Sequence, residues 1–225
     1  MTYMSEQQNL EKVDTANATA VPLINEIALH APEQQYRAGA YSLLAALMRD
    51  VPTAEVLQQA AGMSELAQDK DDLGLAMSML GLAAKHSDPA SVDDEYHDLF
   101  IGLGRGEVVP YGSWYLTGFL MEKPLGQLRD DLAQLGYQRD PSVCEPEDHV
   151  AALCEVMSML IQENRSTSVQ SEFLTQHMSK WLDRFFDDLS KAESASFYQA
   201  VARFGAAFIK FEHQYFGLDI KGVDV

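Results

Sequence analysis

The chain has 225 residues, with 34 acidic against 16 basic side chains and a formal net charge of −18. This length accommodates one domain or two small ones with a buried core, while the negative charge excludes a surface that attracts nucleic acid and favours cationic partners. The two cysteines, Cys144 and Cys154, are too few for a disulfide framework.

The first thirty residues are polar and lack the basic region followed by an apolar region that marks a secretion signal. We therefore expect residues 1–30 to form a mobile tail and the protein to be cytoplasmic. No stretch approaches the roughly 20 consecutive apolar residues that a membrane-spanning helix requires. The sequence thus predicts no stable association with a membrane.

From residue 31 to residue 220, apolar residues recur at steps of three and four, as expected for the buried faces of amphipathic helices. The eight prolines fall between these segments or at their first turns, where a helix tolerates proline. Alternation with a period of two is scarce, so no convincing strand is predicted. The pattern predicts an all-α fold, a single globular helical domain of about eight or nine helices.

Residues 96–116, YHDLFIGLGRGEVVPYGSWYL, crowd glycines and aromatic residues into a stretch that carries little charge. Its GLGRG loop, residues 102–106, follows a helical segment and lacks a Gly-Lys-Ser/Thr ending, so we read it as a sharp turn rather than a phosphate loop. Ser113 lacks the second glycine of a nucleophile elbow. We expect it to N-cap a helix over residues 113–121.

The segment YQRDPSVCEPED contains two prolines and shows no helical periodicity. It predicts a connection, and a candidate hinge over residues 137–147, between N-terminal helices at 33–136 and C-terminal helices at 147–217.

The cluster EPEDH, residues 145–149, closes this connection. Pro146 suits a first helical position, and Glu147 and Asp148 would lie where the helix dipole favours anions. From the sequence alone, helix capping and a binding edge explain the cluster equally well.

Cys144, His149 and Cys154 are spaced five residues apart, which raises the question of a metal site. On a helix, His149 and Cys154 would point about 140° apart, and zinc sites favour closer pairs, so we predict none. A later apolar stripe with a four-residue step contains a histidine that we expect to lie in the core. Its members are Phe173, His177, Trp181 and Phe185.

Three patterns, in this order along residues 36–216, resemble signatures of the TorD/DmsD/NarJ family, closest to the TorD/DmsD branch. The first joins Y-x-x-L-F-x-G to P-Y-x-S-x-Y, the second is E-P-x-D-H, and the third is F-x-x-x-H-x-x-x-W-x-x-x-F. Family members are cytoplasmic, all-helical chaperones for the maturation of molybdenum-containing respiratory enzymes. The resemblance therefore implies a chaperone that has no catalytic residues.

The resemblance also implies the partners. These are the twin-arginine signal peptide and the apo-catalytic subunit of a molybdenum oxidoreductase, which the chaperone would hold until cofactor insertion and then release for export. The residues that we expect to bind the signal peptide are Tyr96, Leu99, Phe100, Pro110, Tyr111, Ser113, Tyr115, Glu147, Asp148 and His149. Some relatives are described as binding guanine nucleotides, but no nucleotide motif is present, and we predict no cofactor.

A twin-arginine leader combines two cations with an apolar segment, so its receptor requires an apolar groove and carboxylates that pair with arginine. Candidates for the groove are Leu99, Phe100, Tyr111, Trp114 and Tyr115, and candidates for the carboxylates are Asp98, Glu147 and Asp148.

Several alternatives stay open at this point. The client could be a trimethylamine N-oxide, dimethyl sulfoxide, formate or nitrate enzyme, and the protein a monomer or a domain-exchanged dimer. A nucleotide-binding or hydrolytic helical protein that uses His149 is the competing function, and a bare helical scaffold is a third.

Overall fold

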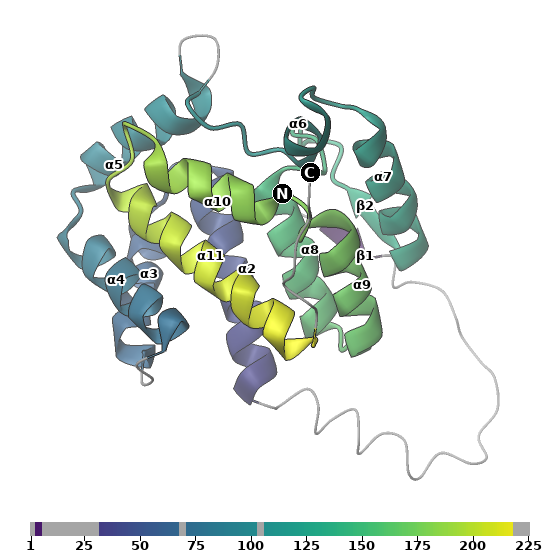
Figure 1. The fold of residues 1–225 in the computed structure, drawn as a ribbon, viewed down its shortest axis with the longest axis horizontal. Coiled ribbons are helices and arrows are strands. Elements are labelled where there is room, and N and C mark those ends of the chain that lie inside the picture. Colours follow the sequence, from purple (N-terminus) through teal and green to yellow (C-terminus); the bar gives the residue numbers. More distant parts are fainter. Residues whose placement is uncertain (1–2, 6–31, 68–70, 103–105, 218–225) are drawn as a thin grey trace.

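Helices account for most of the chain that the computed structural model describes, namely residues 3–5, 32–67, 71–102 and 106–217 (Figure 1). The α-helices within these ranges are α2 Pro32–Arg49, α3 Ala54–Leu66, α4 Asp72–His86, α5 Pro89–Tyr96, α6 Gly112–Thr117, α7 Lys123–Leu135, α8 Val150–Gln162, α9 Thr167–His177, α10 Leu182–Lys191 and α11 Phe197–Tyr215. A π-helical turn, η1 His97–Ile101, continues α5. The all-α prediction is confirmed, with ten α-helices in the described ranges where about eight or nine were expected.

One short ribbon departs from the helical pattern. The strand β1, Tyr3–Ser5, pairs antiparallel with β2, Tyr137–Arg139. The first strand belongs to the expected N-terminal tail, of which residues 6–31 lie outside the described residues. The second strand occupies the start of the candidate hinge, a segment for which the apolar periodicity gave no strand signal.

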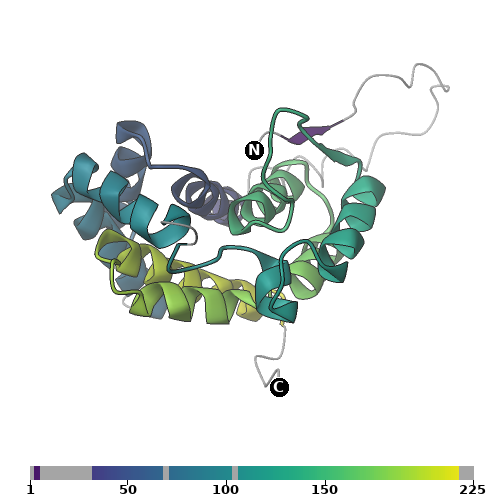
Figure 2. The ribbon, with the colours of Figure 1, turned by 90° about the horizontal axis from the view of Figure 1, so that it is seen from above.

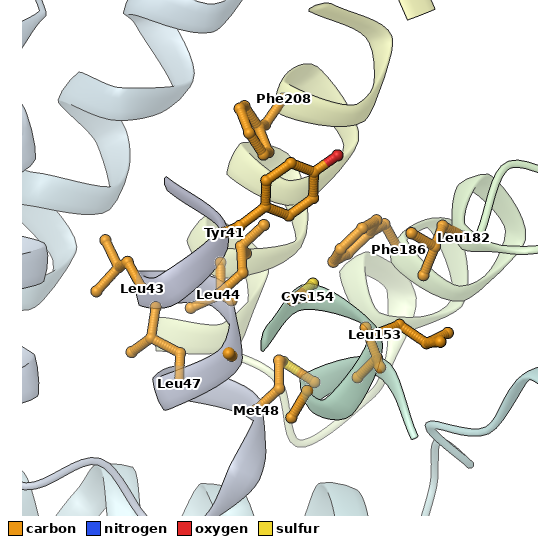
Figure 3. Close-up of a cluster of buried hydrophobic side chains, with 14 of the residues drawn as sticks. Tyr41, Leu43, Leu44, Leu47, Met48, Leu153, Cys154, Leu182, Phe186 and Phe208 are labelled. Carbon is orange, nitrogen blue, oxygen red and sulfur yellow. The ribbon is translucent and has the colours of Figure 1, made fainter. Parts of the chain in front are cut away.

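The core is built around α8, which packs against α2. Ten of the 13 residues of α8 are buried, so this helix is enclosed on almost every side, whereas α2 buries one apolar face. Figure 3 shows Tyr41 and Met48 of α2 meeting Cys154 of α8, with Phe186 of α10 and Phe208 of α11 closing the cluster. Each such side chain contributes about 1.5–3 kcal/mol when it is fully buried.

A buried ion pair fastens the first long helix to the last. The Nε and Nη2 atoms of Arg37 donate to the two carboxylate oxygens of Glu212 at 2.6 and 2.7 Å, and the Tyr41 hydroxyl donates to the same carboxylate at 3.0 Å. The side chain of Arg37 is 1% exposed and that of Glu212 is fully buried. The guanidinium also lies 4.0 Å from the centroid of the Tyr215 ring. The pair therefore joins α2 to α11, a tertiary link that helical periodicity does not predict.

The start of α11 is capped by a side chain from a distant helix. Glu95 of α5 accepts the backbone N–H groups of Ser196 and Tyr198 through one oxygen, at 2.8 and 2.7 Å, and that of Phe197 through the other, at 3.0 Å. The N-cap residue Ser196 itself makes no side-chain capping bond. Both oxygens of the carboxylate are thus used at the positive end of the helix dipole.

The helices divide between two ends of the molecule. In both views α3, α4 and α5 lie at one end and α6, α7 and β2 at the other, with α2, α8 and α11 between them (Figures 1 and 2). The expected signature residues begin at the end of α5 and continue into α6, so this part of the chain connects the two ends.

Candidate functional site

The first signature lies where α5 passes into the π-turn η1. The turn ends at Gly102, whose φ of 54° is in the left-handed region that favours glycine, as the sequence predicted for this loop. Gly106 is required for a second reason, because a Cβ there would lie 2.3 Å from the carbonyl oxygen of Leu99. Residues 103–105 of the loop lie outside the described residues.

Most of this first signature is packed inside the protein. Tyr96 is 5% exposed and Leu99 is fully buried, whereas Phe100 is half-buried and packs against Tyr198 with ring centroids 5.3 Å apart. Tyr96 and Leu99 therefore pack beneath this surface, and Phe100 is the member of the three that reaches solvent.

The P-Y-x-S-x-Y half of the first signature meets the EPEDH cluster, although the two are 35 residues apart in the sequence. Tyr111 and His149 form an isolated antiparallel bridge, with ring centroids 5.0 Å apart. The N–H of Gly112 donates to the carbonyl of Asp148 at 2.9 Å. The expected site residues that this crossing brings together are Pro110, Tyr111, Ser113, Asp148 and His149.

Asp148 caps α6 from across this crossing. Its Oδ2 accepts the N–H of Ser113 at 2.7 Å, whereas its Oδ1 is buried without a hydrogen-bond partner. The prediction that Ser113 N-caps this helix is wrong, because Tyr111 holds the N-cap position in extended backbone and the carboxylate replaces a local cap. The helix also ends at Thr117, short of the expected residue 121.

A helix was expected to start near Glu147, and Pro146 was thought to suit its first position. The helix starts at Val150 instead, which corrects that prediction. His149 is its N-cap, and its Nδ1 accepts the N–H of Ala151 at 3.1 Å. Burial, together with the positive charge of Arg49, lowers the pKa of His149 from 6.5 to about 3, so the ring is neutral near pH 7. A buried ring whose Nδ1 caps a helix is poorly suited to the proton transfer that the hydrolytic alternative requires.

The carboxylates near the crossing differ in what they already bind. Glu147 is 7% exposed and pairs with Arg129 Nη2 of α7 at 2.8 Å and with Arg139 Nε of β2 at 3.5 Å. Glu145 is exposed and accepts the hydroxyl of Tyr111. The negative charge of Glu147 is thus largely compensated, while that of Glu145 faces solvent.

A second exposed carboxylate lies at the other end of α6. The hydroxyl of Tyr115 donates to Asp188 of α10 at 3.0 Å, and Arg184 donates to the carbonyl of Tyr115 at 3.3 Å. Asp188 carries no site signal in the sequence, since only the packing of α10 against α6 brings it to this surface. Asp98, considered as a carboxylate candidate, instead lines a hollow of about 530 Å³ between α5 and the start of α11.

The third signature packs against α6 through Trp181. The Tyr115 ring stacks on Trp181, with centroids 5.5 Å apart and planes inclined by 26°. The stripe does not follow a single helix, because α9 ends at His177 and α10 begins at Leu182. Trp181 donates its indole N–H to the carbonyl of His177 at 2.7 Å, which closes the turn between the two helices.

His177, expected in the core, has a side chain that is 8% exposed and lies 2.9 Å from Asp131 of α7. Within the described ranges, no three His, Cys, Asp or Glu side chains lie close enough together to hold a metal ion. In the same ranges, no helix is both long and apolar enough to cross a membrane.

Three ordered signatures thus meet around one short helix, α6, of an all-helical protein. A family model described as nitrate reductase delta subunit matches residues 46–187, well over half of the chain. The chain therefore belongs to this family, that of the TorD and DmsD redox enzyme maturation chaperones, whose members are not catalysts.

Individual relatives cover the chain to different extents. The chaperone protein TorD of Vibrio cholerae is 31% identical over 127 residues, which is 52% of this chain and 58% of that protein. The Tat proofreading chaperone DmsD of Haemophilus influenzae is 33% identical over 114 residues, 50% of this chain and 55% of that protein. The chain thus spans little more than half the length of these relatives, whereas TorD of Aliivibrio salmonicida is matched over 93% of its length at 23% identity.

A solved structure supports the fold. The crystal structure of a redox enzyme maturation protein from Archaeoglobus fulgidus superposes with a TM-score of 0.57 at 20% identity, over 77% of this chain and 93% of that one. At this level of identity the likeness concerns the helical architecture.

Proposed function

We propose that this protein is a cytoplasmic maturation chaperone that binds the twin-arginine leader and the apo-catalytic subunit of a molybdenum oxidoreductase. The observation that carries the proposal is the junction of the three signatures around α6, where Tyr111 pairs with His149 and Asp148 caps the helix. The names of the relatives, TorD chaperones and a Tat proofreading chaperone, support the same partner class.

The ten expected residues take two roles in this proposal. Phe100 and Tyr111 are half-exposed and would contact the leader directly. The others are buried and would hold that surface in place; they are Tyr96, Leu99, Pro110, Ser113, Tyr115, Glu147, Asp148 and His149. A leader with two arginines suits this part of the molecule because the chain carries a net charge of −18 and exposes Glu145 beside Tyr111.

The expected affinity is moderate. Burying three or four apolar leader side chains contributes about 6–8 kcal/mol, and ordering a flexible peptide costs about 2–5 kcal/mol of it. Pairing of arginine with carboxylate returns part of that cost. The sum stays below about 8 kcal/mol, so the dissociation constant should lie between about 1 μM and 1 mM, which suits a partner that must be released.

Calorimetry with synthetic leader peptides tests the proposal. Leaders of a trimethylamine N-oxide reductase and of a dimethyl sulfoxide reductase should bind, and replacing both arginines by glutamine should weaken binding at least tenfold. The control is a scrambled peptide of identical composition. If the scrambled and native leaders bind equally well, leader recognition is not the function of this surface.

A further inference from the structure

The turn between α6 and α7 exposes a run of large apolar side chains. We call residues 116–121 the apolar tip; its exposed members are Leu116 (39%), Phe119 (68%), Leu120 (47%) and Met121 (71%). Isolated apolar residues on a surface are ordinary, but four within six consecutive residues form a patch of the kind that marks an interaction site.

Hydrogen bonds hold the apolar tip in a defined shape. The N–H of Met121 donates to the hydroxyl of Ser113 at 3.2 Å, and the hydroxyl of Thr117 donates to the carbonyl of Ser113 at 2.8 Å. Met121 has a φ of 59°, a left-handed conformation that is strained for a residue with a side chain. The chain therefore maintains a strained turn whose apolar side chains face water.

The apolar tip is connected to the crossing of the signatures through one residue. Ser113 accepts the N–H of Met121 through its hydroxyl and donates its own N–H to Asp148 at 2.7 Å. The EPEDH cluster thus supports the helix that carries the tip.

Two exposed carboxylates flank this helix. Glu145 accepts the hydroxyl of Tyr111 through Oε2, and Asp188 accepts that of Tyr115 through Oδ2. In each carboxylate the tyrosine contacts one oxygen, so the charge is fixed in place at an exposed position. An apolar patch that follows a helix carrying two anchored anions is complementary to an apolar peptide segment that lies next to cations.

We propose that the apolar tip seats the apolar segment of the client's leader, while Glu145 and Asp188 pair with the arginines that precede it. This inference rests on the function proposed above and names the part of the surface that receives each half of the peptide. Another exposed apolar group lies on α3 and α4, at the opposite end of the molecule (Figure 1); its members are Leu66, Leu75, Met79 and Leu82. That group serves as a matched control.

Fluorescence anisotropy with a labelled leader peptide and the full chain tests the inference. The double variant Phe119→Ser/Met121→Ser should bind at least tenfold more weakly, the loss expected when apolar anchors of an interface are truncated. The control variant Leu75→Ser/Leu82→Ser should change affinity less than twofold. A peptide that contains the arginines but lacks the apolar segment should bind the unmodified protein and the tip variant alike.

A second measurement does not depend on variants. A leader peptide with photoreactive leucine in its apolar segment should crosslink to residues 116–121 of the unmodified protein. Crosslinks to residues 75–82, or tip variants that bind as tightly as the unmodified protein, would overturn the inference while leaving leader binding intact. If the tip variants instead abolish a dimer without weakening leader binding, the tip is a self-association surface. Failure of the unmodified protein to bind any leader would overturn both proposals.

Discussion

Two buried carboxylates, Glu95 and Asp148, each cap a helix that is distant from them in the sequence, and they do so differently. Glu95 uses both oxygens, accepting three backbone N–H groups at the start of α11. Asp148 uses one oxygen on α6 and leaves the other buried without a partner. An unpartnered buried acceptor costs stability, so the first cap is complete as a structural device and the second is not. The complete cap is made by a residue of α5, whereas the incomplete cap belongs to α6, the helix at the surface proposed to bind the leader.

The largest effect is expected at Glu95. Glu95→Gln keeps the size of the side chain but replaces one accepting oxygen by an amide group that faces N–H donors. The free energy of unfolding should fall by about 3 kcal/mol, measured by urea denaturation, because charge-assisted bonds are lost and a donor is left unsatisfied. A loss below about 1 kcal/mol would show that the capping of α11 does not depend on this carboxylate.

The next effect concerns the cap of α8, which is an imidazole rather than a carboxylate. The pKa of His149 is lowered by burial to about 3, so the unfolded chain binds a proton below pH 6.5 that the folded protein excludes. The contribution of the neutral His149 ring to the free energy of unfolding is present above pH 6.5 and is lost as the pH falls towards 3. Between pH 7 and pH 5 it should decrease by about 2 kcal/mol.

Asn provides the control for this titration, since it can also N-cap a helix but does not titrate. Urea denaturation of His149→Asn should show a shallower loss of stability between pH 7 and pH 5 than the unmodified protein. Parallel pH profiles for the two proteins would contradict the prediction and assign the acid sensitivity to other groups.

The smallest effect on stability is expected at Asp148. Asp148→Asn can keep its carbonyl oxygen on the N–H of Ser113 and replaces only the oxygen that has no partner, so the unfolding free energy should change by about 1 kcal/mol or less. The leader affinity should fall more than the stability, because the buried negative charge near the peptide site is removed. If Asp148→Asn costs as much stability as Glu95→Gln, the two caps are equivalent and the comparison fails.

The sequence predicted the long helices well because apolar residues recur in them at steps of three and four. It failed where tertiary contacts decide local structure. Nothing in the sequence indicates that the carboxylate of Asp148 caps α6 at Ser113, and β2 forms only through pairing with β1. The stripe through His177 and Trp181 kept its helical spacing across a turn, so periodicity alone could not reveal the break between α9 and α10.

The expected site residues stay a prediction, and the exposure of their side chains could not be read from the sequence. The structure joins Tyr111 and His149 in one bridge, and their binding role stays a prediction. That Glu147 is already paired with arginines, and that Asp188 lies beside Tyr115, depends on the packing of α7 and α10. Such pairings have no signal in a single sequence.

The pair formed by Arg37 and Glu212 has a consequence for how the protein is made. The partners are 175 residues apart, so at about 5–20 residues per second a ribosome adds the second roughly 10–35 s after the first. Until Glu212 has been added, Arg37 of α2 lacks the carboxylate with which it is buried in the folded protein. We therefore expect the core to close only after α11 has been made, and a chain that ends before Glu212 should not complete this fold.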